Sequence, residues 1–102
     1  MSDEDAKKGI LEEAVKSAMA MGIVDTIRSF VAILATKAWQ SMGLTINPST
    51  GKIEKNLEDS RLAIDALAGL IELIGPRIPG EELRQYRALL QDLQLNFVNQ
   101  SQ

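Results

Sequence analysis

The sequence predicts an all-α fold, a small helical bundle of three to four helices. Apolar residues recur at helical spacing through four separate segments, and glycine, asparagine and proline stand at the borders between them. No internal repeat or low-complexity tract interrupts this pattern. At 102 residues the chain is long enough for one domain, residues 1–102, with a modest core. Only four residues are aromatic, so we expect that core to be mostly aliphatic.

The first helix is expected over residues 3–21. Its apolar stripe consists of Ile10, Leu11, Ala14, Val15, Ala18 and Met19. Because alanine contributes little apolar area, this stripe is a weak anchor, and we expect a helix that is shorter than the others, moves independently or docks on a partner. Gly22 either ends this helix or lies within a longer one, since a single glycine costs only about 1 kcal/mol.

The second helix is expected from Asp25, as its N-cap, to about Met42, with Gly43 as its left-handed stop. At 100° per residue one apolar arc contains Ile23, Ile27, Phe30, Val31, Leu34, Ala38 and Met42. Trp39 lies at the margin of this arc. It either anchors a partner or closes the edge of the core over Ile46 or Ile53.

The connection over residues 44–55 is expected to contain an ordered, structural loop. Its turn residues are Asn47, Pro48, Thr50 and Gly51. Asparagine bonds its own backbone in turns, proline fixes φ, and glycine accepts positive φ. The flanks 44–46 and 52–54 either pair as a very short hairpin, with Ile46 and Ile53 held against the bundle, or stay unpaired.

Two further helices follow this loop. The third is capped by Asn56 and ends at Gly75-Pro76, and the fourth opens after Pro79-Gly80. The apolar line of the third helix consists of Leu57, Ile64, Leu67, Ile71 and Ile74, and that of the fourth consists of Leu83, Tyr86, Leu90, Leu93 and Phe97.

Several large apolar residues lie outside these lines and form the candidate interface: Trp39, Leu62, Leu70, Leu73 and Leu95. A chain of this length has few other elements to cover both sides of two helices, and soluble monomers avoid large exposed apolar patches. We therefore expect a homo-oligomer, most simply a two-fold dimer. An unidentified protein partner is one alternative. The other is that the first helix packs over Leu62 and Leu73 of the same chain, which would leave no uncovered apolar residues to explain.

Composition argues against an active site. The chain has no cysteine and no histidine, so thiolate or imidazole chemistry and the usual activated nucleophiles are excluded. No catalytic residue, cofactor or metal is expected. The alternative, carboxylate chemistry, would use Glu58, Asp65 and Glu72, which we interpret as a solvated face. Asp65 differs because it lies among apolar neighbours, where it could cap a backbone group. A buried Lys37 beside Thr36 or Ser41 would also reopen the enzyme hypothesis.

Charge argues against nucleic acid and membrane partners. The net charge is −3, which offers no attraction to phosphates. The weaker alternative is a basic patch formed by Arg77, Arg84 and Arg87 with Lys52 and Lys55. No apolar run suits a membrane span. The acidic start of the sequence does not fit a signal peptide, so the expected location is the cytoplasm.

A set of short motifs runs from Ile27 to Val98: Phe30-Val31, Leu34-Ala35-Thr36, Ala38, Gly43-Leu44, Asn47-Pro48, Thr50-Gly51, Asn56-Leu57, Ile64-Asp65, Leu89-Leu90, Asp92-Leu93 and Phe97-Val98. Over these residues the chain resembles a small bacterial family, domain of unknown function 1844 (DUF1844). It departs from the family pattern at Gly75 to Gly80, which carries two prolines. The resemblance implies a short, mostly helical protein, and it implies no activity.

Overall fold

The computed structural model describes residues 3–102, apart from the side chains of Asp3, Glu4, Ala14, Ser17 and Ala18. Its elements are α1 (Asp3–Ala20), α2 (Ile23–Ser41), α3 (Leu57–Ile74), the 3₁₀ helix η1 (Gly75–Arg77) and α4 (Gly80–Ser101). No β-strand occurs in the described residues. The all-α prediction is therefore confirmed.

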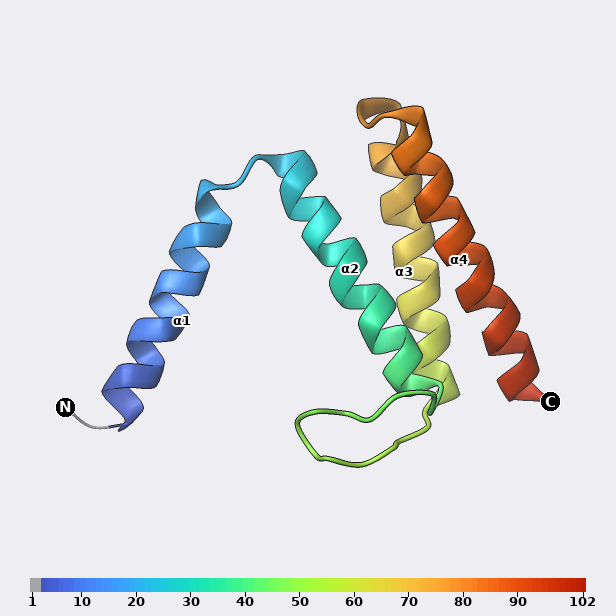
Figure 1. The fold of residues 1–102 in the computed structure, drawn as a ribbon, viewed down its shortest axis with the longest axis horizontal. Helices are drawn as coiled ribbons and strands as arrows, with labels where there is room; N and C mark the ends of the chain where they lie inside the picture. Colours follow the sequence, from blue (N-terminus) through green and yellow to red (C-terminus); the bar gives the residue numbers. More distant parts are fainter. Residues whose placement is uncertain (1–2) are drawn as a thin grey trace.

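Helices α2, α3 and α4 form an antiparallel bundle in which α3 lies in the middle (Figure 1). Its buried core is made of Val31, Ala35, Ala38, Met42, Ile64, Leu67, Ile71 and Leu93. On α3 and α4 the expected apolar lines supply most of the contacts. On α2 the arc is only partly buried, because Ile23 and Phe30 are exposed. Burial of the other apolar side chains of these helices holds α2 and α4 to the central helix α3.

Helix α1 stands apart from this bundle (Figure 1). Every α1 side chain that the structure describes is exposed, including Ile10, Leu11, Val15 and Met19. The radius of gyration is 16.1 Å, larger than the roughly 13 Å expected of a compact domain of this length. At 18 residues α1 is as long as α3 and shorter than α2 and α4, and the expectation that it moves independently or docks on a partner stays a prediction. Two residues of its stripe, Ala14 and Ala18, lie outside the described side chains.

Gly22 separates α1 from α2. It is the N-cap of α2 with an extended backbone, and its carbonyl accepts hydrogen bonds from the backbone N–H and the hydroxyl of Thr26. The expected cap, Asp25, lies within the first turn instead and pairs with Arg28. Only Met21 and Gly22 link the two helices, so the direction of α1 depends on a very short hinge.

The connection between α2 and α3 contains a turn built on Asn47. Its side-chain oxygen accepts from the Ser49 N–H, and its carbonyl accepts from the N–H groups of Thr50 and Gly51. Two isolated antiparallel bridges, Met42 with Lys55 and Asn47 with Lys52, replace the alternative of a hairpin.

The flanks of this turn do not pack on the bundle as expected. Ile46 and Ile53 are 58% and 64% exposed. Backbone hydrogen bonds set the path instead: the Asn47 N–H donates to the Lys52 carbonyl at 2.9 Å. Ile46 and Ile53 are therefore apolar residues that are not buried within a single chain.

Gly51→Ala is expected to destabilise the protein by about 1 kcal/mol, because Gly51 has φ +68°, a conformation that costs a residue with a Cβ roughly that amount. An added Cβ would meet no atom within 4 Å, so the loss would be purely conformational. Urea unfolding measures it. Gly9→Ala, in a helix with equally open space, is the control. Equal midpoints for Gly51→Ala and the wild type would contradict the turn geometry.

Asn56 caps α3 as expected: its side-chain oxygen accepts from the Asp59 N–H at 3.1 Å. Asn56→Ala is expected to lower the free energy of unfolding by about 1 kcal/mol, because an N–H of the first turn loses its partner. Asn56→Asp keeps an acceptor and serves as the matched control. Chemical denaturation should place Asn56→Asp near the wild type, and a loss as large as that of alanine would argue against a capping role.

Candidate functional site

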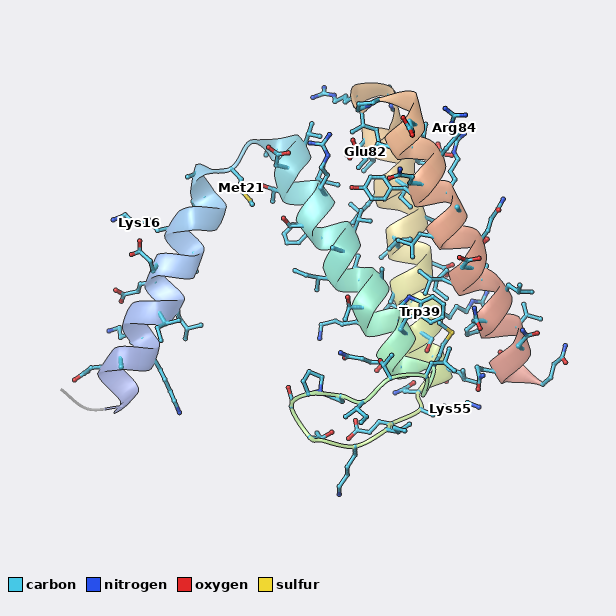
Figure 2. The ribbon with its side chains drawn as sticks, in the orientation of Figure 1. Lys16, Met21, Trp39, Lys55, Glu82 and Arg84 are labelled. Atoms are coloured by element: carbon cyan, nitrogen blue, oxygen red, sulfur yellow. The ribbon has the colours of Figure 1, made fainter. Side chains whose placement is uncertain are left out.

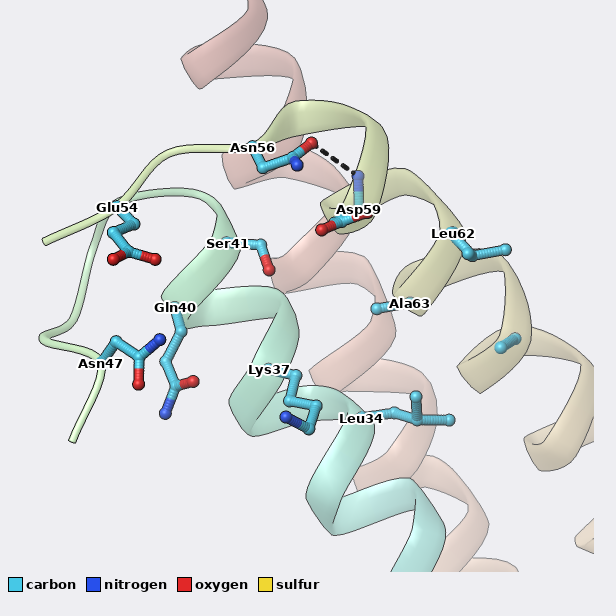
Figure 3. A pocket seen from close by; sticks show the side chains of 11 residues that line it. Leu34, Lys37, Gln40, Ser41, Asn47, Glu54, Asn56, Asp59, Leu62 and Ala63 are labelled. Carbon is cyan, nitrogen blue, oxygen red and sulfur yellow. Dashed lines mark hydrogen bonds between the residues drawn. The ribbon is translucent and has the colours of Figure 1, made fainter. Parts of the chain in front are cut away.

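A groove of about 410 Å³ lies between α2 and α3 at the end where the loop joins them (Figure 3). The wall from α2 includes Leu34 and Lys37, and the wall from α3 includes Leu62 and Ala66. Glu54 and other loop residues close its end. The α3 wall of the groove is therefore mostly apolar, whereas the α2 wall beyond Leu34 and the loop end are polar.

The apolar surface continues along both helices beyond this groove. On α2, Phe30 lies one turn before Leu34, and Ile23 lies two turns before Phe30 on the same side. On α3, Leu73 follows Leu62 by eleven residues, about three full turns, so the two share one side. We name this surface the α2–α3 face: Ile23, Phe30, Leu34, Leu62, Ala66 and Leu73.

The large side chains of the α2–α3 face are poorly covered. Ile23 is 72% exposed, Phe30 51%, Leu62 70% and Leu73 69%. Helix α4 packs against α3 elsewhere, and α1 does not cover this side (Figure 1). Burying one such leucine is worth about 1.5–3 kcal/mol, so a covering partner would gain substantial free energy.

The five candidate interface residues do not form one surface. Leu62 and Leu73 belong to the α2–α3 face. Trp39 and Leu70 are half-buried and pack against the core. Leu95 is exposed on α4, about 200° around that helix from the fully buried Leu93, so it points away from the bundle.

Asn56, at the loop end of the groove, is engaged with the backbone. The Asn56 N–H donates to the Ser41 carbonyl at 2.7 Å, and the Asn56 side chain caps α3. Lys37 is exposed, and the hydroxyl of its neighbour Thr36 donates to the Ala32 carbonyl at 3.0 Å. Lys37 is therefore not the buried ammonium that would point to an activated hydroxyl.

The carboxylates of α3 lie on the outside of the helix. Glu58, Asp65 and Glu72 are all exposed. Asp65 does not cap a backbone group, as the sequence suggested: it is 71% exposed and lies 3.9 Å from Arg61, one turn before it. Its apolar sequence neighbours face other sides of the helix. Within residues 3–102 no cluster of three or more potential metal-ligating side chains was found.

The basic residues considered as a patch lie at opposite ends of the bundle. Arg84 is near the start of α4, whereas Lys55 is at the far end (Figure 2). There the Lys55 ammonium donates to the Gln100 side chain at 3.4 Å. The arginines and the loop lysines therefore do not form one basic surface, which is evidence against the weaker alternative of a basic patch.

An ion pair between α2 and α4 was missed by the sequence analysis. The guanidinium of Arg28 donates to both carboxylate oxygens of Glu82, at 2.6 and 3.0 Å, and to Asp25 at 2.6 Å. Glu82 lies at the start of α4 on the side that faces α2 (Figure 2). The hydrogen bonds to Glu82, and then the one to Asp25, raise the pKa of Arg28. Residues 54 positions apart leave no local signal of such a pair.

This pair predicts a pH dependence of stability. The hydrogen bonds from Arg28 lower the pKa of Glu82 below its ordinary 4.5. A carboxyl group with a lowered folded-state pKa contributes stability that is complete above its unfolded-state pKa and is lost as the pH falls through its folded-state pKa. Glu82→Gln should therefore lower Tm at pH 7, and its deficit should shrink below about pH 4.5.

Thermal unfolding between pH 7 and pH 2 measures this difference. Glu81→Gln removes a neighbouring, exposed carboxylate and is the control. A deficit for Glu82→Gln that is the same at every pH would contradict the role given to its charge.

The fold and the α2–α3 face define a small all-α domain with an open apolar surface. Comparison with family models identifies the particular group: residues 24–99 match the model described as domain of unknown function (DUF1844), and the chain belongs to this family. The matched region contains the loop, α3, η1, all of α2 except its first residue and all of α4 except its last two residues, whereas α1 precedes it. Comparisons with curated proteins and with solved structures gave no match.

No helix in the described part of the chain is both long and apolar enough to cross a bilayer.

Proposed function

We propose that this protein is a non-enzymatic helical interaction module that associates with itself through the α2–α3 face. The observation that carries the proposal is the pair Leu62 and Leu73, each about 70% exposed on one side of the central helix. Phe30 and Ile23 extend the same surface along α2. Large contiguous apolar patches on soluble proteins mark sites of association.

A two-fold dimer is the simplest assembly for such a surface. Most soluble homo-oligomers are closed and symmetric, and in a two-fold dimer each apolar residue of the patch is buried twice. Two leucines per chain then give four buried leucine side chains per dimer. At about 1.5–3 kcal/mol each, they supply several kcal/mol toward the cost of association.

The concentration dependence of Tm tests this proposal. A dimer unfolds to two chains, so its Tm rises with protein concentration, whereas the Tm of a monomer does not change. We expect a rising Tm between micromolar and hundred-micromolar chain concentrations. A constant Tm over this range would contradict self-association.

The remaining expectations from the sequence stay predictions. They are a cytoplasmic location, a bacterial origin, and a protein that lacks a catalytic centre, a cofactor, and nucleic acid or membrane partners. A thermal-shift screen with divalent metals and nucleotides addresses the carboxylate and anionic-ligand alternatives. We expect no shift in Tm with either class.

A further inference from the structure

Among the described residues, two of the uncovered apolar surfaces lie on different helices of the same chain. One is the α2–α3 face. The other is the stripe of α1, where Leu11 is 66% exposed, Val15 60% and Met19 80%. A helix takes most of its stability from the packing of its apolar side, so α1 is only marginally stable while that side is uncovered. Each surface could therefore bury the apolar side chains of the other.

We propose that α1 of a second copy of this chain lies along the α2–α3 face. This inference rests on the proposed self-association and names the segment that covers the face. In the structure α1 points away from its own bundle (Figure 1). Only Met21 and Gly22 separate it from α2, and short hinges favour exchange of a terminal element between two copies over its return to its own chain.

The dimensions of the two surfaces agree. Helix α1 has 18 residues, the same number as α3, and α2 has 19. Leu11 and Met19 are eight residues apart, about 12 Å along the helix axis. Leu62 and Leu73 are eleven residues apart, about 16.5 Å. The stripe of one α1 therefore fits within the length of the α2–α3 face.

Charge sets the direction in which α1 lies. Lys7 and Lys8 precede Leu11 by about one turn and share its side of the helix. The groove carries two carboxylates at its loop end, Glu54 and Asp59, against one cation in its lining, Lys37 (Figure 3). With Lys7 and Lys8 at that end, α1 runs parallel to α3. Met19 then lies near Leu73, and Leu62 lies near the lysines.

Cysteine cross-linking between two full-length chains tests this arrangement, because the native sequence has no cysteine. One chain carries Met19→Cys, and the other carries either Leu73→Cys or Leu62→Cys with a tag of different mass. Leu73 and Leu62 are 69% and 70% exposed, so the two positions are matched in accessibility. After mixing and mild oxidation, we expect the heterodimer with Leu73→Cys to form at least about tenfold faster than the one with Leu62→Cys.

Three results would overturn the proposal. Faster cross-linking to Leu62→Cys would reverse the direction of α1. A second result combines two experiments: the mixed single variants form no heterodimer, and the double variant Met19→Cys/Leu73→Cys forms a disulfide within one chain. This result would mean that α1 packs on its own bundle. Equal, slow rates for both pairs would mean that α1 does not dock on this face.

Light scattering on the same mixtures before oxidation separates this inference from the proposed function. A dimer mass with no preferred cross-link would leave self-association standing and remove α1 as its cover. A monomer mass would remove both.

Discussion

Leu67→Ala is expected to lower the free energy of unfolding by about 2–5 kcal/mol, the largest effect of any single truncation proposed for this chain. Leu67 lies in the middle of α3 and is 0% exposed in the cluster that joins α2, α3 and α4. Truncation removes the buried methyl groups and leaves a cavity that the surrounding helices fill only partly. Since small domains are stable by only about 5–15 kcal/mol, the variant would be close to unfolding.

Urea denaturation followed by circular dichroism measures this loss. Leu95→Ala is the matched control, because it makes the same chemical change on the outer side of α4, where Leu95 is 61% exposed. We expect the control to change stability by less than about 0.5 kcal/mol. Similar losses for the two variants would mean that α3 is not the centre of the core.

Leu62→Glu combined with Leu73→Glu is expected to convert the proposed dimer to a monomer. Each substitution removes an apolar side chain from the α2–α3 face and would place a charge in the buried contact. Every change occurs twice in a two-fold dimer. Losing about 1.5–3 kcal/mol at each site weakens the dissociation constant by at least about 100-fold even for one substitution.

The fold should survive these two substitutions, because both side chains already face solvent within one chain. Helical circular dichroism should therefore stay near the wild-type value while the mass falls. Leu95→Glu is the control for adding a charge at an exposed leucine, and it should leave the dimer unchanged. A dimer that resists the double substitution would exclude the α2–α3 face as the interface.

The end of α2 and the start of α3 were readable from the sequence because local chemistry sets them, whereas the N-cap of α2 is Gly22 and not the expected Asp25. Gly43 has φ +80° at the end of α2, and Asn56 caps α3 through its own side chain. Ile64, Leu67 and Ile71 recur at helical spacing, and all three are buried. Such signals act within a few residues, so one sequence suffices to find them.

The arrangement of the helices was less accessible. Ile23 and Phe30 share the periodicity of the buried residues on α2, yet both stay exposed, because no helix of the same chain covers that side. Asp65 was expected among apolar side chains because its neighbours in sequence are apolar. It is exposed, because those neighbours lie on other sides of the helix. The contact between Arg28 and Glu82 depends on how α2 and α4 pack, which no local pattern encodes.

The α2–α3 face illustrates how far periodicity goes. Leu62 and Leu73 were identified as surplus apolar residues on α3, and the structure places them together on one side. Leu70 and Trp39 looked similar in sequence but pack against the core. Which of these residues are buried depends on where α2 and α4 pack around α3, and this arrangement cannot be read from the spacing of apolar residues.

The mass of the full chain in solution tests the central claim most directly. Light scattering over a dilution series from about 100 micromolar to about 1 micromolar covers the range in which moderately tight dimers form. Our account predicts about twice the chain mass of 11.2 kDa at the higher concentrations. A mass of 11.2 kDa throughout the series would contradict it, because the apolar α2–α3 face would then stay exposed to water.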